Sequence, residues 1–220
     1  MLKKVRDAVS DLRSGGPVLP AAQEVWPLEN IAVKEQADRF RTNLETVAGE
    51  IVFCNDLTEA ADRVAQLLES TDSLRLAVLD RPLSRAMAER LEAAYPGKRE
   101  LTFAPPNAAE VSAEPLALLD AAVVSPEWLL CDTGSCLFTA PTTFDRLITY
   151  ITPLSIVIAS RSMLRENLPQ VWAELKGGLE TAQTGEFVIV TGPSRTADIE
   201  KILILGVHGP KRLVVFLVEE

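Results

Sequence analysis

The sequence predicts an α/β protein in which a parallel or mixed sheet is flanked by helices in three layers. Short apolar runs recur from Ile51 onwards and alternate with segments of helical periodicity, which is the pattern of strand–helix–strand units. Few polar residues interrupt these runs, as expected of strands that are buried on both faces. The 220 residues, 47% of them hydrophobic and 24% charged, are enough for one sizeable globular core.

The chain is expected to consist of a helical N-terminal arm, residues 1–48, and an α/β domain, residues 49–220. Leu2–Leu12 has weak helical periodicity, and a second helix is predicted over Ala37–Val47. Strands are predicted, in chain order, at Ile51–Cys54, Leu76–Leu79, Ala121–Val124, Leu154–Ala159, Phe187–Val190 and Leu213–Val218.

Helices are expected between these strands. Asp56 and Glu59 have the spacing of a capping box and predict a helix start after the first strand. A second helix is predicted over Leu83–Tyr95, where Pro96 and Gly97 follow it. Helical sequence then follows the Leu154–Ala159 strand as far as about Leu175.

The run Thr191–Thr196, TGPSRT, is the strongest candidate for a binding site. It follows Phe187–Val190, which is predicted to be a buried strand, and it precedes a segment predicted to be a short helix. The first backbone N–H groups of a helix attract anions, and the guanidinium of Arg195 suits a carboxylate or phosphate. We therefore predict a small-anion site at Ser194, Arg195 and Thr196. The alternative is that Ser194 and Thr196 only cap the helix.

A second motif is Asp132-Thr133-Gly134. It lies between Trp128–Cys131 and Ser135–Phe138, which are expected to pair as strands, and it has the composition of a hairpin turn. These three residues are also candidates for ligand contact if the fold brings the turn close to Ser194.

Downstream, His208 and Asp198 are the candidates for acid–base roles, and Glu200 is a candidate substrate contact. His208 is the only histidine, and an imidazole titrates near neutral pH. The alternatives are that His208 lies in a turn between Gly206 and Gly209, and that the two acids belong to a first helical turn.

The composition argues against several classes of function. A net charge of −9 opposes general nucleic-acid binding. No apolar run is long enough to span a membrane, and the first residues lack a secretory pattern, so we expect a cytoplasmic protein. Three separated cysteines and one histidine predict neither an iron–sulfur cluster nor a multi-histidine zinc site. With no dinucleotide or phosphate-loop fingerprint, we expect no cofactor and no metal.

The segments Gly192–Glu200 (GPSRTADIE) and Gly206–Pro210 (GVHGP) closely resemble the LUD-domain family, in particular its lactate-utilisation protein C group. Asp132–Gly134 looks like the acid-Thr-Gly element of that family, although Ser135 stands where threonine is common. The motif-level resemblance covers roughly Ala121 to the last residue. It implies a fold related to ribose-phosphate isomerase, glucosamine-phosphate deaminase and CoA transferases. It also implies a role in oxidising L-lactate to pyruvate alongside two iron–sulfur partner proteins.

The sequence therefore predicts a cluster-free subunit or accessory factor of L-lactate oxidation that binds a small carboxylate or phosphate. Electron carriers would belong to the iron–sulfur partners. Two alternatives stay open. One is a stand-alone enzyme acting on a phosphorylated sugar or an acyl-CoA. The other is a non-catalytic assembly subunit whose apparent site is a structural turn.

Overall fold

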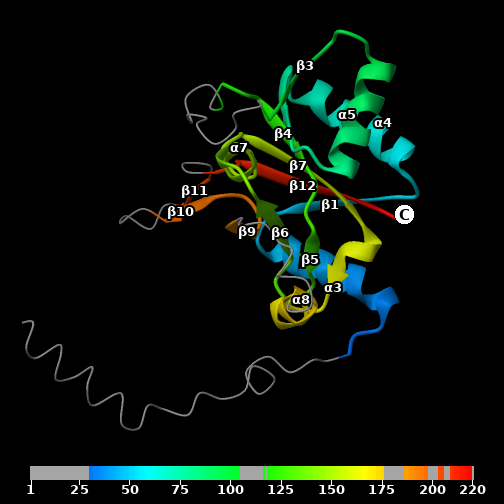
Figure 1. Ribbon diagram of the computed structural model, residues 1–220, viewed down its shortest axis with the longest axis vertical. Helices are drawn as coiled ribbons and strands as arrows, with labels where there is room; N and C mark the ends of the chain where they lie inside the picture. Colours follow the sequence, from blue (N-terminus) through cyan, green and yellow to red (C-terminus); the bar gives the residue numbers. More distant parts are fainter. Residues whose placement is uncertain are drawn as a thin grey trace, which may run out of the picture.

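Six parallel strands form the central sheet of the computed structural model (Figure 1). The structure describes residues 30–104, 116, 118–175, 186–197, 203–205 and 209–219. In spatial order the central sheet consists of β1 (Glu50–Cys54), β12 (Arg212–Val218), β7 (Leu154–Ser160), β4 (Ala121–Val124), β2 (Arg75–Val78) and β3 (Glu100–Phe103).

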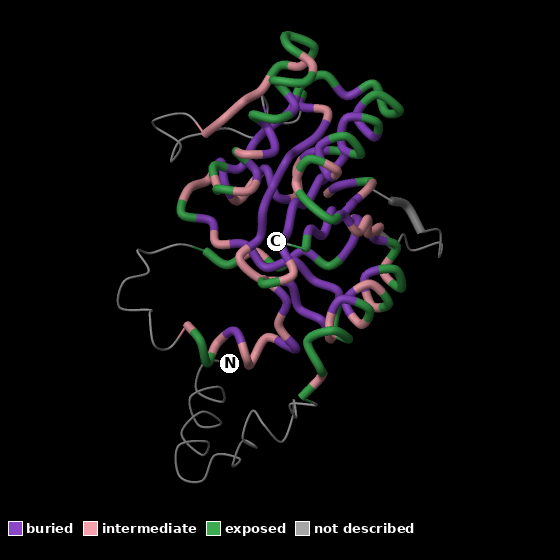
Figure 2. The backbone as a smooth tube through the Cα atoms, turned by 90° about the vertical axis from the view of Figure 1, so that its right-hand side faces the viewer, coloured by how far each residue is buried: buried purple, intermediate pink, exposed green. Residues whose placement is uncertain are grey.

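The strands of the central sheet are apolar because both faces of the sheet are covered. Successive side chains of a strand point to opposite faces. In β12, Leu213 and Val215 therefore belong to one hydrophobic core, whereas Val214 and Phe216 belong to the other. Figure 2 shows these buried segments running through the middle of the molecule. The prediction of apolar, buried strands is confirmed for the inner strands β12, β7 and β4, whereas the edge strands β1 and β3 are mostly half-buried and β3 was not predicted.

Helices and a second sheet cover the two faces. On one side lie α4 (Leu57–Ser70) and α5 (Pro82–Ala94), which contribute Val64 and Met87 to the core. On the other side lie α3 (Val33–Thr46), α7 (Thr143–Ile148) and a mixed four-stranded sheet (Figure 1). The predicted three-layer α/β architecture is confirmed.

The second sheet is built around the hairpin that the sequence predicts on either side of Asp132–Gly134. Its strands β5 (Trp128–Leu130) and β6 (Ser135–Ala140) are antiparallel, which confirms that prediction. The helix α8 (Leu168–Leu175) packs on its outer face through Val171, against Leu130 and Leu137. In spatial order the strands are β8 (Leu164–Arg165), β5 (Trp128–Leu130), β6 (Ser135–Ala140) and β9 (Glu186–Val190).

The predicted start of α4 is confirmed in atomic detail. The Asp56 carboxylate accepts hydrogen bonds from the backbone N–H groups of Thr58 and Glu59, at 2.8 Å each. The Glu59 carboxylate in turn accepts the backbone N–H of Asn55 at 2.8 Å. These bonds satisfy amides that the helix itself leaves without a partner.

One prediction near the carboxyl-terminal motif is wrong. The Phe187–Val190 run is a strand, but β9 belongs to the second sheet, and Val190 is its only buried residue. Residues Arg195–Ala197 form β10, which pairs antiparallel with β11 (Leu203–Leu205). Residues 198–202, where the sequence predicts the start of a short helix, lie outside the described residues, so that helix stays a prediction.

The stretch after β7 is also more varied than predicted. Instead of continuous helical sequence it forms a 3₁₀ turn, η2 (Arg161–Met163), then the short β8, and only then α8. The β8 strand pairs in parallel with β5, so a pairing partner distant in sequence overrides the local helical pattern here.

The helix predicted over Ala37–Val47 is confirmed as α3, which begins earlier, at Val33. Phe40 and Leu44 of this helix are fully buried in the core. The division at residues 48 and 49 stays a prediction, and the helix predicted over Leu2–Leu12 lies outside the described residues. Within the described part of the chain, every helix is too short or too polar to cross a membrane.

Candidate functional site

The Asp132–Gly134 turn is pressed against the carboxyl-terminal end of α3. Gly134 has φ +65°, in the left-handed region that favours glycine, and a Cβ at this position would lie 2.3 Å from the backbone N of Leu44. The side-chain amide of Asn43 donates a hydrogen bond to the carbonyl of Cys131 at 2.7 Å. Tertiary contacts therefore fix both the conformation and the position of this turn.

The turn meets the Thr191–Ser194 segment, so the structure brings the two sequence motifs together. The Ser135 and Thr191 hydroxyl oxygens lie 2.7 Å apart, although the residues are 56 positions apart in sequence. The Ser135 hydroxyl donates to Thr133 Oγ1 at 2.8 Å, and the Thr133 hydroxyl donates to Asp132 Oδ1 at 3.3 Å. Hydrogen bonds thus run from Thr191 through Ser135 and Thr133 to the Asp132 carboxylate. We call these four residues the hydroxyl chain.

The charges around the hydroxyl chain disfavour a bound anion. Gly192, at φ +75°, packs so closely that a Cβ would lie 2.6 Å from the carbonyl oxygen of Val47, just after α3. Carbonyls at the carboxyl-terminal end of a helix carry partial negative charge, to which Asp132 adds. Burial raises the pKa of Asp132, although hydrogen bonding by Thr133 and the positive charge of Arg39 oppose that rise.

We expect Asp132→Asn to raise the thermal unfolding midpoint relative to wild type, by an amount that grows from pH 3 to pH 8. The folded-state pKa of Asp132 is raised, so its proton stabilises the fold at low pH. That contribution is lost as pH rises through the folded pKa. The measurement is a series of thermal melts of both proteins, with the exposed Asp62→Asn as control. A difference that does not change with pH would contradict the expectation.

The other predicted site residues are placed differently. The backbone N–H of Ser194 donates to the carbonyl of Pro210 at 2.8 Å, just before the amino end of β12. Ser194 thus lies near the amino end of a central strand, rather than at the carboxyl-end crevice that such sheets use. Arg195 and Thr196 pair through β10 with Leu205 and Ile204. Asp198, Glu200 and His208 lie outside the described residues, so their roles stay predictions.

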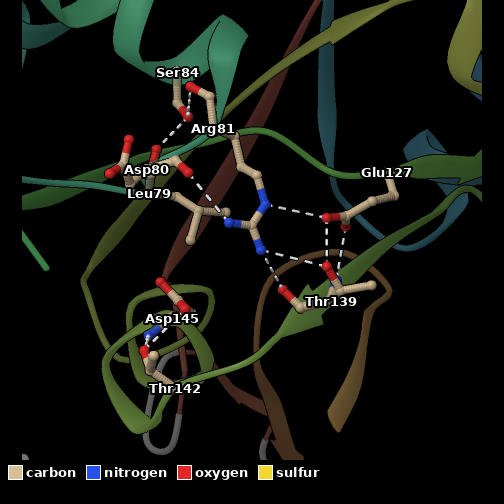
Figure 3. Close-up of polar contacts among 8 residues, drawn as sticks. All are labelled: Leu79, Asp80, Arg81, Ser84, Glu127, Thr139, Thr142 and Asp145. Carbon is tan, nitrogen blue, oxygen red and sulfur yellow. Dashed lines mark hydrogen bonds and ion pairs between the residues drawn. The ribbon is translucent and has the colours of Figure 1, made fainter. Parts of the chain in front are cut away.

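A second polar cluster, which sequence reasoning missed, follows the carboxyl ends of β2 and β4. From β2 the chain moves outward to β3 and then returns to β4 on the other side of β2, so the strand order reverses between β2 and β4. Ligands of open α/β sheets bind at such a reversal. Figure 3 shows Asp80, Arg81, Glu127 and Thr139. Together with Arg85 they form what we call the strand-end cluster.

Arg81 joins three elements of the fold at this cluster (Figure 3). Its Nε lies 3.2 Å from Glu127 Oε1, and its Nη2 donates to the carbonyl and the hydroxyl of Thr139 at 3.1 and 3.3 Å. The Glu127 carboxylate also accepts the backbone N–H of Thr139 at 2.7 Å. The Arg81 and Glu127 side chains are 25% and 24% exposed, so solvent screens this pair less than a surface pair. Arg81 therefore positions the strand-end cluster.

Arg85 is the accessible cation of the cluster. Its Nη2 lies 2.7 Å from Asp80 Oδ1, and the two side chains are 48% and 51% exposed. Arg85 lies in the first turns of α5, which begins at Pro82. Among the described residues, the side chain of Arg81, the N-cap of α5, makes no capping hydrogen bond. The sequence signal for the strand-end cluster is the Asp80-Arg81-Pro82 run directly after an apolar strand.

The buried thiols offer no nucleophile at neutral pH. Burial raises the pKa of both Cys131 and Cys136 to about 12, so they stay protonated. Among the described residues, no three histidine, cysteine, aspartate or glutamate side chains are grouped so that they could hold a metal ion.

Curated relatives and a solved structure resemble this chain. YkgG of Escherichia coli strain K12 is 31% identical over 103 residues, which are 44% of this chain and 43% of that protein. Lactate utilization protein C of Bacillus pumilus is 28% identical over 100 residues, which are 44% of this chain and 42% of that protein. Each alignment thus spans less than half of the relative's own length.

A solved DUF162-family protein of Deinococcus radiodurans shares the fold. It aligns with a TM-score of 0.57 and 14% identity, over 86% of this chain and 99% of its own. The family model described as the LUD domain matches residues 37–218, which include the hydroxyl chain, the strand-end cluster and all six strands of the central sheet. This chain is therefore a member of the LUD-domain family.

Proposed function

We propose that this protein takes part in the oxidation of L-lactate to pyruvate as a cluster-free subunit or accessory factor that works with iron–sulfur proteins in the cytoplasm. The LUD-domain match over residues 37–218 supports the proposal, as does the likeness to two proteins named Lactate utilization protein C. Electron transfer would belong to the partners, and this chain would bind a small carboxylate.

The strand-end cluster is the carboxylate site that the geometry supports best. The observation that carries this choice is the solvent-accessible Arg85 beside the first turn of α5, at the point where the strand order reverses. A guanidinium matches a carboxylate in shape and charge. The hydroxyl chain, by contrast, directs its donors at Asp132.

Binding at this cluster would proceed by exchange of carboxylates. Asp80 is half exposed, so Arg85 can release it to water and take the carboxylate of the ligand at little cost, since exposed ion pairs contribute only about 0–1 kcal/mol. Arg81 would stay with Glu127 and Thr139 and hold the corner in place. The site predicted at Ser194, Arg195 and Thr196 is the competing location.

The test is L-lactate-dependent dye reduction by the purified iron–sulfur partners, with and without this chain. We expect activity to require the chain, and Arg85→Gln to raise the KM for L-lactate about tenfold through loss of one charge-assisted contact. The matched control is Arg63→Gln on α4, because Arg63 is 49% exposed and paired with Glu59 in the same manner. This control variant should behave as wild type.

Each contrary outcome has a distinct meaning. Activity that is indifferent to the chain would refute the role in lactate oxidation. Activity that needs the chain but is the same for Arg85→Gln and Arg63→Gln would refute the strand-end site. A loss with Arg195→Ala in that second case would assign the carboxylate to the TGPSRT segment.

A further inference from the structure

The outer face of β9 carries an exposed apolar surface. Phe187 and Ile189 are 37% and 44% exposed, and they lie two residues apart, on the same side of the strand. The ring of Trp172, from α8, meets the Phe187 ring edge to face, with centroids 5.0 Å apart. We call Trp172, Phe187 and Ile189 the β9 patch.

The β9 patch is exposed because α8 covers only part of the second sheet. Ile189 pairs with Leu137 of β6, so both side chains lie on the outer face. Leu137 is fully buried under Val171 of α8, whereas Ile189 lies beyond the reach of that helix. Within the described residues β9 pairs only with β6, so one of its edges is also open. Adjacent apolar side chains on an open strand indicate a docking surface.

The described chain begins close to this surface. The backbone N–H of Ile31 lies 3.4 Å from Glu166 Oε2, and Glu166 stands two residues before the start of α8. The eight residues of α8 span about 12 Å. Residues 13–29, at about 3.3 Å each when extended, reach several times that far. Residues ahead of Asn30 can therefore reach the β9 patch.

The sequence of residues 2–12 suits such a surface. Leu2, Val5, Val9 and Leu12 follow the spacing that places apolar side chains along one side of a helix, with Lys, Arg and Asp at most other positions. An 11-residue helix would be about 16 Å long, more than enough to span Phe187 and Ile189, which lie about 7 Å apart along β9. The segment between α8 and β9, residues 176–185, has only Leu179 as a large apolar residue.

We propose that residues 2–12 dock as an amphipathic helix on the β9 patch of the same chain and cover Phe187 and Ile189. The apolar stripe packs on the patch, and the basic and acidic side chains face water. This docking is independent of the proposed role in lactate oxidation.

The test is the rate at which a thiol reagent modifies a cysteine placed in the patch by Ile189→Cys. The native cysteines are buried, so the new thiol is the reactive one. In the full-length chain we expect labelling at least tenfold slower than for Val33→Cys, whose site is 76% exposed. Adding Val5→Asp and Val9→Asp should raise the Ile189→Cys rate about tenfold. Lys4→Asp, which changes the net charge by the same amount but lies off the stripe, should leave it slow.

Four results would overturn the proposal. Fast labelling of Ile189→Cys without the N-terminal changes would mean that the patch is open in the free protein and serves another partner. Slow labelling that persists with Val5→Asp and Val9→Asp would mean that another part of the chain covers it. Protection that weakens on dilution would assign the cover to a second copy, and loss of protection with Lys4→Asp would make it a charge effect. Far-ultraviolet circular dichroism of each variant separates undocking from unfolding.

Discussion

Replacing Gly134 by alanine is expected to destabilise the protein by about 2–5 kcal/mol. Two costs add at this position. A left-handed conformation costs a residue with a Cβ about 1–2 kcal/mol, and overpacking costs about 1–3 kcal/mol more. The overpacking is severe because the new methyl group would lie 2.3 Å from the backbone N of Leu44, which cannot rotate away as a side chain can. The free energy of unfolding in urea measures the effect.

Gly97 supplies the matched control. It has almost the same φ, +66°, but a Cβ there would have no neighbour within 4 Å. Gly97→Ala should therefore cost only the conformational part, about 1–2 kcal/mol. Equal losses for Gly97→Ala and Gly134→Ala would mean that the turn does not press on α3.

Five of the six central strands could be predicted from sequence because their signals are local, whereas the edge strand β3 (Glu100–Phe103) was missed. A strand buried on both faces must be apolar throughout, and runs such as Ala121–Val124 meet that requirement. The capping arrangement at Asp56 and Glu59 is likewise set within five residues, from Asn55 to Glu59. Such features do not depend on which distant segment lies beside them.

The error at β9 arises because apolar composition does not determine which sheet a strand joins. Phe187–Val190 is as apolar as the central strands, yet it pairs with β6 at the edge of the second sheet and is therefore only partly buried. Pairing with a distant partner decided this outcome.

The candidate sites show the same division. The Asp132–Gly134 turn is predictable from its residues, whereas its contact with Thr191 depends on β6 and β9 being neighbours. The Arg81–Glu127 pair joins residues 46 positions apart. It marks a candidate site only because it lies where the strand order reverses between β2 and β4. A single sequence carries no direct signal for either juxtaposition.

Phe40→Ala is expected to destabilise the protein by about 3–5 kcal/mol, the usual loss for a fully buried phenylalanine. Phe40 lies in the core between α3 and the sheets, together with Leu44. Urea unfolding measures the loss, with Val33→Ala on the same helix as control. Val33 is 76% exposed, so this control should change stability by no more than about 0.5 kcal/mol.

The size of this effect also tests where the α/β domain begins. The division predicted from sequence places α3 in an N-terminal arm, and truncation in a loosely attached arm should cost less than about 1 kcal/mol, because little buried surface would be lost. A loss of 3–5 kcal/mol in a single cooperative transition would make α3 part of the domain. The backbone of α3 also contacts the Gly134 turn, so such a loss would mean that the helix holds both the core and the hydroxyl chain in place.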